Sequence, residues 1–133
     1  MEFILGFVIV AFVFAVIDAI WLKLSSGFYK REIGGLLLEK PNFRAAIIFY
    51  AIYVIGIVVF AVMPALNGNS WVVAVGYGAL LGLVAYATYD LTNLATLKNW
   101  SQKVVIIDML WGTVVTALSA TVAYLSLSSW FGL

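Results

Sequence analysis

"WVVAVGYGALLGLVAYATYDLTNLATLKNW", residues Trp71–Trp100, decides the fold class of this chain. Its first half is almost purely apolar, and the segment is long enough to cross the hydrocarbon core of a bilayer, which takes about 20 residues. Its second half nevertheless carries a carboxylate and an amide, Asp90 and Asn93. Polar groups inside a membrane span normally face other helices or a wet cavity. The segment therefore predicts a spanning helix with one functional face.

The composition of the whole chain is that of an integral membrane protein. Its 133 residues are 65% hydrophobic and 10% charged, with a mean hydropathy of +1.14. The apolar runs are unbroken and do not alternate with polar residues, which favours helices over a barrel. The chain has no cysteine and no histidine, so disulfides, thiolate chemistry and histidine-ligated haem are excluded. The expected partner is the lipid bilayer, and no nucleic acid.

The apolar runs predict an all-α membrane protein with four transmembrane helices in an antiparallel bundle. The expected spans cover about residues 3–22, 45–66, 71–92 and 104–125, in a single domain. The start lacks the basic region of a signal peptide, so we expect it to be kept as the first span. "RAAIIFYAIYVIG" from Arg44 is weakly similar to "KVVIIDMLWGTV" from Lys103, which allows two parallel-related hairpins.

The basic residues all fall on one side of this four-span arrangement. They cluster in and beside the connections 23–44 and 98–103, whereas the "NGNS" turn at 67–70 and both termini have none. By the positive-inside rule these connections are cytoplasmic. We therefore expect a multi-pass protein of the bacterial cytoplasmic membrane, with both termini outside.

Three aspartates from different spans lie at a similar depth, one or two turns from the cytoplasmic boundary. An aspartate inside a span costs about 3 kcal/mol near the membrane centre on insertion scales, so three in one layer indicate a functional site. Tyrosines, an asparagine and a tryptophan share the layer. The candidate ligand- or cation-binding residues are Asp18, Tyr50, Tyr53, Tyr86, Tyr89, Asp90, Asn93, Asp108 and Trp111.

Helical spacing supports the convergence of these groups. Tyr86, Asp90 and Asn93 are separated by four and then three residues, so they share one helix face. Gly82 and Gly78 continue that face as a small-residue stripe of the kind that allows helices to approach closely in membranes. Asp90 is therefore expected to point at a neighbouring helix.

The stretches "FYAIYVIGIVVFAVMPAL", "YATYDLTNLATLKNW" and "DMLWG" resemble the small bacterial membrane family catalogued as domain of unknown function 2177. The resemblance covers nearly the whole chain and implies several membrane spans without implying an activity. Tyr89-Asp90 and Pro64-Ala65-Leu66 also match fragments of intramembrane aspartyl proteases. However, Asp108 follows "VII" and not Gly-x-Gly, and Pro64 precedes both aspartates at the opposite end of its helix. We reject that assignment.

The polar layer favours proton- or cation-linked transport of a small solute or ion by a homo-oligomer, since one four-helix bundle has little room for an enclosed pathway. Oxygen ligands suit a hard divalent cation, for which Asp18, Asp90 and Asp108 are the candidate ligands. A retinal Schiff base is not expected, because no lysine lies inside a span. The site would take a small cationic solute, an ion or a lipid.

Two alternatives remain open at this point. Two carboxylates could act as acid and base in a membrane enzyme that modifies a lipid or isoprenoid at the cytoplasmic interface. In a structural accessory subunit, by contrast, the aspartates would pair with lysines and only fix the register of the helices.

Overall fold

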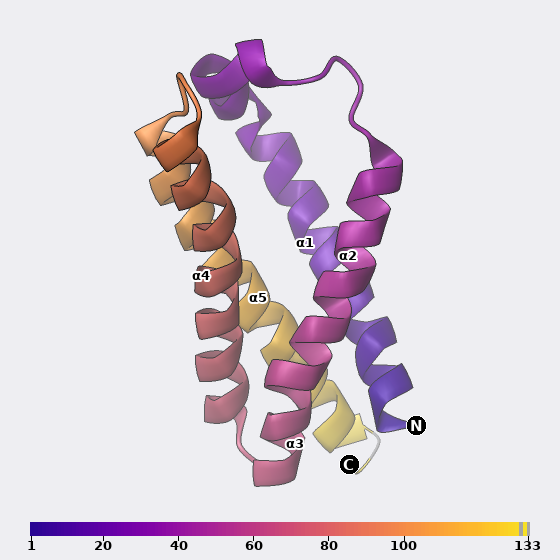
Figure 1. Ribbon diagram of the computed structural model, residues 1–133. Helices are drawn as coiled ribbons and strands as arrows, with labels where there is room; N and C mark the ends of the chain where they lie inside the picture. The colour runs from indigo at the N-terminus through magenta and orange to yellow at the C-terminus, as the bar shows by residue number, and fades with distance from the viewer. Residues whose placement is uncertain (131, 133) are drawn as a thin grey trace.

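The computed structural model describes residues 1–130 and 132, and within them the secondary structure is helical (Figure 1). The helices are α1 (Glu2–Ile33), α2 (Phe43–Ile57), α3 (Met63–Gly68), α4 (Trp71–Thr96) and α5 (Gln102–Trp130). A 3₁₀ turn, Gly34–Leu36, follows α1. Four helical stretches are long and apolar enough to cross a membrane, Glu2–Leu36, Phe43–Gly68, Trp71–Thr96 and Gln102–Trp130. The predicted fold class is confirmed.

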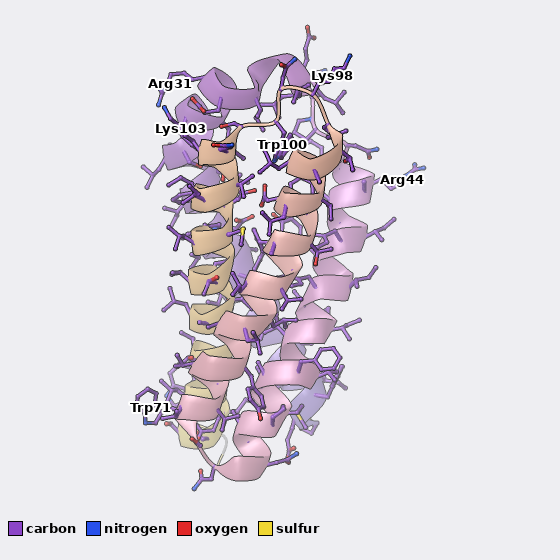
Figure 2. All side chains as sticks on the ribbon, turned by 60° about the vertical axis from the view of Figure 1, so that its left-hand side comes forward. Arg31, Arg44, Trp71, Lys98, Trp100 and Lys103 are labelled. Atoms are coloured by element: carbon purple, nitrogen blue, oxygen red, sulfur yellow. The ribbon has the colours of Figure 1, made fainter. Side chains whose placement is uncertain are left out.

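The two ends of the bundle differ in charge. The start of α1 and the end of α5 lie at the end that contains the tight turn between α3 and α4 (Figure 1). Arg31, Arg44, Lys98 and Lys103 lie at the other end, whereas Trp71 lies near the tight turn (Figure 2). We call the end with these arginines and lysines the basic end. It contains the connections 37–42 and 97–101.

The first helix extends beyond the predicted span, through Ile33 and not only to Leu22. Residues 23–33 were expected to belong to a cytoplasmic connection. They contain no proline and only one glycine, Gly27, so nothing in this segment stops the helix. The helix ends only where Gly34 and Gly35 make helical backbone costly. The Ser101 hydroxyl donates to Glu32 over 2.7 Å and fastens this extension to the start of α5.

A π-helical turn, Val58–Val62, joins α2 to α3 within one continuous helix. Pro64 follows it at the start of α3. Proline has no N–H and clashes with the carbonyl four residues earlier, so a regular α-helix cannot pass through it without adjustment. The wider π turn supplies that adjustment, as such turns do in other interrupted helices.

The helices α4 and α5 pack closely along small residues. The buried residues of α4 are Ala74, Gly78, Gly82 and Asp90, which is the predicted stripe together with its carboxylate. A side-chain carbon on Gly82 would overlap the backbone of Gly112 in α5. The absence of side chains at these two positions therefore allows the backbones to approach each other.

The first half of α2 stands apart from α4 (Figure 1). The two helices meet where the rings of Tyr53 and Tyr86 pack, and beyond this point the π turn and α3 contact α4. The apolar core fills the space near this convergence, with Phe14, Ile57, Val58 and Leu127 fully buried. Toward the basic end the four spans diverge, and polar side chains take the place of the apolar core.

Candidate functional site

A cavity of about 640 Å³ lies in the basic half of the bundle, where the helices diverge. Residues from all four spans line it, and aromatic rings make up much of the wall. Its carboxylates are Asp18 and Asp108, and its aromatic residues are Trp21, Tyr29, Tyr50, Tyr86, Tyr89, Trp100 and Trp111. The cavity therefore combines negative charge with aromatic surface.

A second cavity of about 400 Å³ adjoins the first and shares Tyr86, Tyr89 and Asp108 with it. Its other lining residues are Phe49 of α2 and Ala85 of α4. Phe49 and Tyr89 are 47% and 55% exposed, so they lie on the outer surface of the bundle. This side cavity opens between α2 and α4, where these two helices stand apart.

Asp18 is held on α1 by donors from two other helices. The Tyr50 hydroxyl of α2 donates to one carboxylate oxygen. The Trp111 indole N–H of α5 donates to the other over 3.2 Å. The Trp111 ring stacks on Trp21, with centroids 4.5 Å apart and planes 8° from parallel. Asp18 is 8% exposed, so its position is fixed while one edge faces the cavity.

Asp108 accepts a hydrogen bond from the Tyr29 hydroxyl. Tyr29 lies in the extension of α1 and was missed by the sequence reasoning, which placed that segment in a connection. Asp18, Trp21, Ser25 and Tyr29 are spaced by three and four residues, which places them along one helix face. If the first helix is predicted to continue to the Gly34-Gly35 pair, this spacing identifies Tyr29 as a candidate site residue.

Asp90 is the most buried of the three aspartates, with 0% of its surface exposed. Neither of its carboxylate oxygens has a hydrogen-bond partner within the described residues. It lies behind the cavity wall, on the face of α4 that packs against α5. The neighbouring acid is Asp108 of α5. Asp90 and Asp108 are therefore neighbours without a hydrogen bond of ordinary geometry between them.

The other predicted residues divide between the cavity and its surroundings. Tyr86 and Tyr89 line both cavities, and the Tyr86 ring packs against Gly112. Tyr53 points away into the core, where its hydroxyl lies 2.7 Å from that of Thr116. Asn93 is half-buried on α4 and is not among the lining residues.

Besides Tyr29, the wall residues that the sequence reasoning left out of the site include two tryptophans and a lysine, Trp21, Trp100 and Lys30. Trp100 lies beneath the connection between α4 and α5 (Figure 2), with its ring against Tyr89. Its indole N–H is buried and has no acceptor in the described part of the chain.

The aspartates do not form a metal centre of the usual kind. In residues 1–130 and 132, no group of three acidic side chains is arranged to hold a metal ion. Asp18 is bound to Tyr50 and Trp111, whereas Asp90 and Asp108 adjoin each other. Binding of a hard divalent cation stays a prediction from residue type, and the described residues contain no set of ligands that matches it.

Comparison with known proteins gives one match. The family described as predicted membrane protein (DUF2177) matches residues 3–125. No curated protein and no solved structure matches the chain.

Proposed function

The chain belongs to the DUF2177 family of predicted membrane proteins, and from the chemistry of its cavity we propose that it binds a small organic cation and moves it across the membrane. One observation carries the proposal: Asp18 and Asp108 face a cavity whose walls are largely aromatic. Alkylated ammonium groups are recognised in such cages, because aromatic faces attract cations by about 0.5–2 kcal/mol each.

The hydrogen-bond partners of both carboxylates are neutral. Tyr50 and Trp111 donate to Asp18, and Tyr29 donates to Asp108. These donors satisfy the oxygens without cancelling their charge, so a positively charged ligand can still be attracted. The accessory-subunit alternative expected lysine partners instead. Lys30 also lines the cavity, but it is an exposed residue whose ammonium group can extend to water.

The size of the cavity suits the proposed ligand. Its volume of about 640 Å³ lies within the roughly 300–1,000 Å³ of typical small-molecule sites. We propose that the basic end is cytoplasmic, so the solute site faces the cell interior. Movement to the other side requires the core around Phe14 and Ile57 to open, and this is the step that transport assays test.

Binding can be tested through the tryptophans of the cavity. Replacing Trp71 and Trp130, which lie on exposed surface, with phenylalanine leaves Trp21, Trp100 and Trp111 as the only tryptophans, which can be excited selectively over tyrosine. Choline is expected to change their emission in the purified protein, and its neutral carbon isostere, dimethylbutanol, to have little effect. Equal responses to both compounds would exclude a cation site.

Replacement of either cavity carboxylate should weaken choline binding. Asp18→Asn and Asp108→Asn each remove a negative charge beside the ligand, and a lost charged interaction of about 1.5–3 kcal/mol corresponds to about a 10- to 100-fold loss of affinity. Glu39→Gln, in the connection outside the cavity, is the matched control and should bind normally. Uptake of labelled choline into proteoliposomes then separates transport from binding alone.

The sideways opening favours a second candidate function, an enzyme that modifies a lipid or isoprenoid. A membrane-dissolved substrate could enter between α2 and α4, past Phe49 and Ala85. Ala85→Phe should fill the side cavity without changing a wall residue of the larger one. It is expected to leave choline affinity unchanged, whereas an enzyme fed from the bilayer would lose product formation in membrane extracts.

A further inference from the structure

Asp90 occupies a position that a charged carboxylate can hardly tolerate. It is fully buried, and neither of its oxygens has a hydrogen-bond partner within the described residues. An ionised carboxylate without partners in a low-dielectric interior pays a desolvation cost of several kcal/mol. Lipid around the bundle supplies no compensating water. The neutral, protonated acid is the form that fits this environment.

The register of α4 against α5 brings a second acid to Asp90. Gly82 packs on Gly112, and Gly78 packs on Thr116, so the two helices run antiparallel with these positions opposed. Two turns beyond Gly82, Asp90 therefore lies opposite the first turns of α5, and Asp108 lies one turn from Gly112. The Asp108 carboxyl accordingly acts on Asp90.

The ionisable groups that line the cavity together with Asp108 are tyrosines, Asp18 and Lys30. From α1, Tyr29 donates to Asp108. From α4 itself, Tyr89 adjoins Asp90 in the sequence, and Tyr86 and Tyr89 line a cavity together with Asp108. The first half of α2 stands apart from this part of α4. Asp108 faces the cavity, whereas Asp90 does not.

We propose that Asp90 and Asp108 form a proton-binding site, in which one proton is held by the buried pair and exchanges with the cavity through Asp108. The proton reaches water through the cavity and the basic end. Protonation leaves the pair with a single negative charge, and loss of the proton leaves it with two. This site shares Asp108 with the proposed solute site, whereas Asp90 lies outside the cavity and serves the proton alone.

The proposal can be tested by infrared spectroscopy of the purified protein at neutral pH. The chain has no aspartate other than Asp18, Asp90 and Asp108. Aspartate labelled with heavy carbon in its carboxyl group therefore marks only these three. The wild type should show a protonated-carboxyl band that shifts with this label and in deuterated water. Asp90→Asn should abolish the band, and Asp18→Asn, the matched control, should retain it.

A second variant covers the case in which Asp90→Asn does not fold. In the double variant Asp18→Asn/Asp108→Asn, the label reports on Asp90 alone, and its protonated band should persist at an altered frequency because the neighbouring acid is gone. Absence of a protonated aspartate band in the wild type would overturn the proposal. The proposal would also be overturned if the Asp90→Asn protein folded and kept the wild-type band unchanged. An ionised Asp90 in the double variant would have the same consequence.

If the proposed function also holds, the proton site couples to the solute. A cation bound beside Asp108 would favour the form of the pair in which both Asp90 and Asp108 are ionised. Choline binding should therefore release a proton into weakly buffered solution. Asp90→Asn should bind choline without this release. Absence of choline binding would reject the solute proposal and leave the infrared result to decide the proton site separately.

Discussion

At the scale of single residues, the three aspartates differ in their partners more than in their depth. Asp18 has two neutral donors, Asp108 has one, and Asp90 has none within the described chain. A buried polar group without a partner is costly, so the three positions suit different protonation states. This difference separates a solute-facing carboxylate, Asp18, from a buried acid, Asp90, with Asp108 between them.

Tyr29→Phe tests the link between the extension of α1 and the site. It removes the hydroxyl that donates to Asp108 and keeps the ring. Loss of a hydrogen bond to a charged group should lower the free energy of unfolding by about 1.5–3 kcal/mol, measured by denaturation in detergent. Trypsin should also cut faster after the exposed Lys30 and Arg31.

The control for this change is Tyr77→Phe, whose side chain is 53% exposed on α4. It should leave both stability and cleavage unchanged. Equal stability of Tyr29→Phe and wild type, with equal rates of cleavage, would show that the hydroxyl does not hold the extension in place.

At the scale of the elements, the site depends on one tight helix pair and one divergent helix. Small residues bring α4 and α5 together and set the register that opposes Asp90 to the start of α5. By contrast, the first half of α2 stands apart from α4, and the two helices meet only from the packed rings of Tyr53 and Tyr86 onward. The cavity exists because the first half of α2 stands apart from α4.

Gly82→Ala tests the packing of α4 on α5. The added methyl group would come within 2.8 Å of the Thr116 hydroxyl and would overlap the Gly112 backbone. The helices must then separate, and overpacking of this kind costs about 1–3 kcal/mol. Thermal unfolding should show the loss, and the protonated band of Asp90 should shift as its contact with Asp108 changes.

The matched control is Gly76→Ala on the same helix, where an added methyl group meets no atom within 4 Å. A surface change of this kind should alter stability by less than about 0.5 kcal/mol. If both alanine variants behaved alike, the close approach at Gly82 would not be a determinant of stability.

At the scale of the whole molecule, the start of α1 and the end of α5 lie at one end, and the arginines and lysines labelled in Figure 2 lie at the other. Such an arrangement predicts orientation in the membrane, because basic connections are retained in the cytoplasm. The cavity is complete within one chain. The predicted homo-oligomer is therefore not needed to build the site, and oligomerisation stays a prediction from sequence.

Orientation can be measured directly because the chain has no cysteine. Gly68→Cys, in the tight turn, should react with a membrane-impermeant thiol reagent in intact cells. Glu39→Cys, at the basic end, should react only after the membrane is opened. The reverse pattern would place the solute site on the outside of the cell.

The sequence by itself determined the class of the protein, its four apolar helices and the end at which its basic residues gather. These features follow from the composition of each segment alone, since the cost of placing a residue in lipid does not depend on distant parts of the chain. The sequence also placed Tyr86 and Asp90 on the packing face of their helix, because helical spacing is local.

Only the tertiary structure decided which groups meet. It paired Tyr29 with Asp108, joined Tyr50 and Trp111 to Asp18, and left Asp90 without a partner among the described residues. It also directed Tyr53 into the core. The rotation and tilt of a membrane helix are set by the helices that pack against it, and no single segment contains that information.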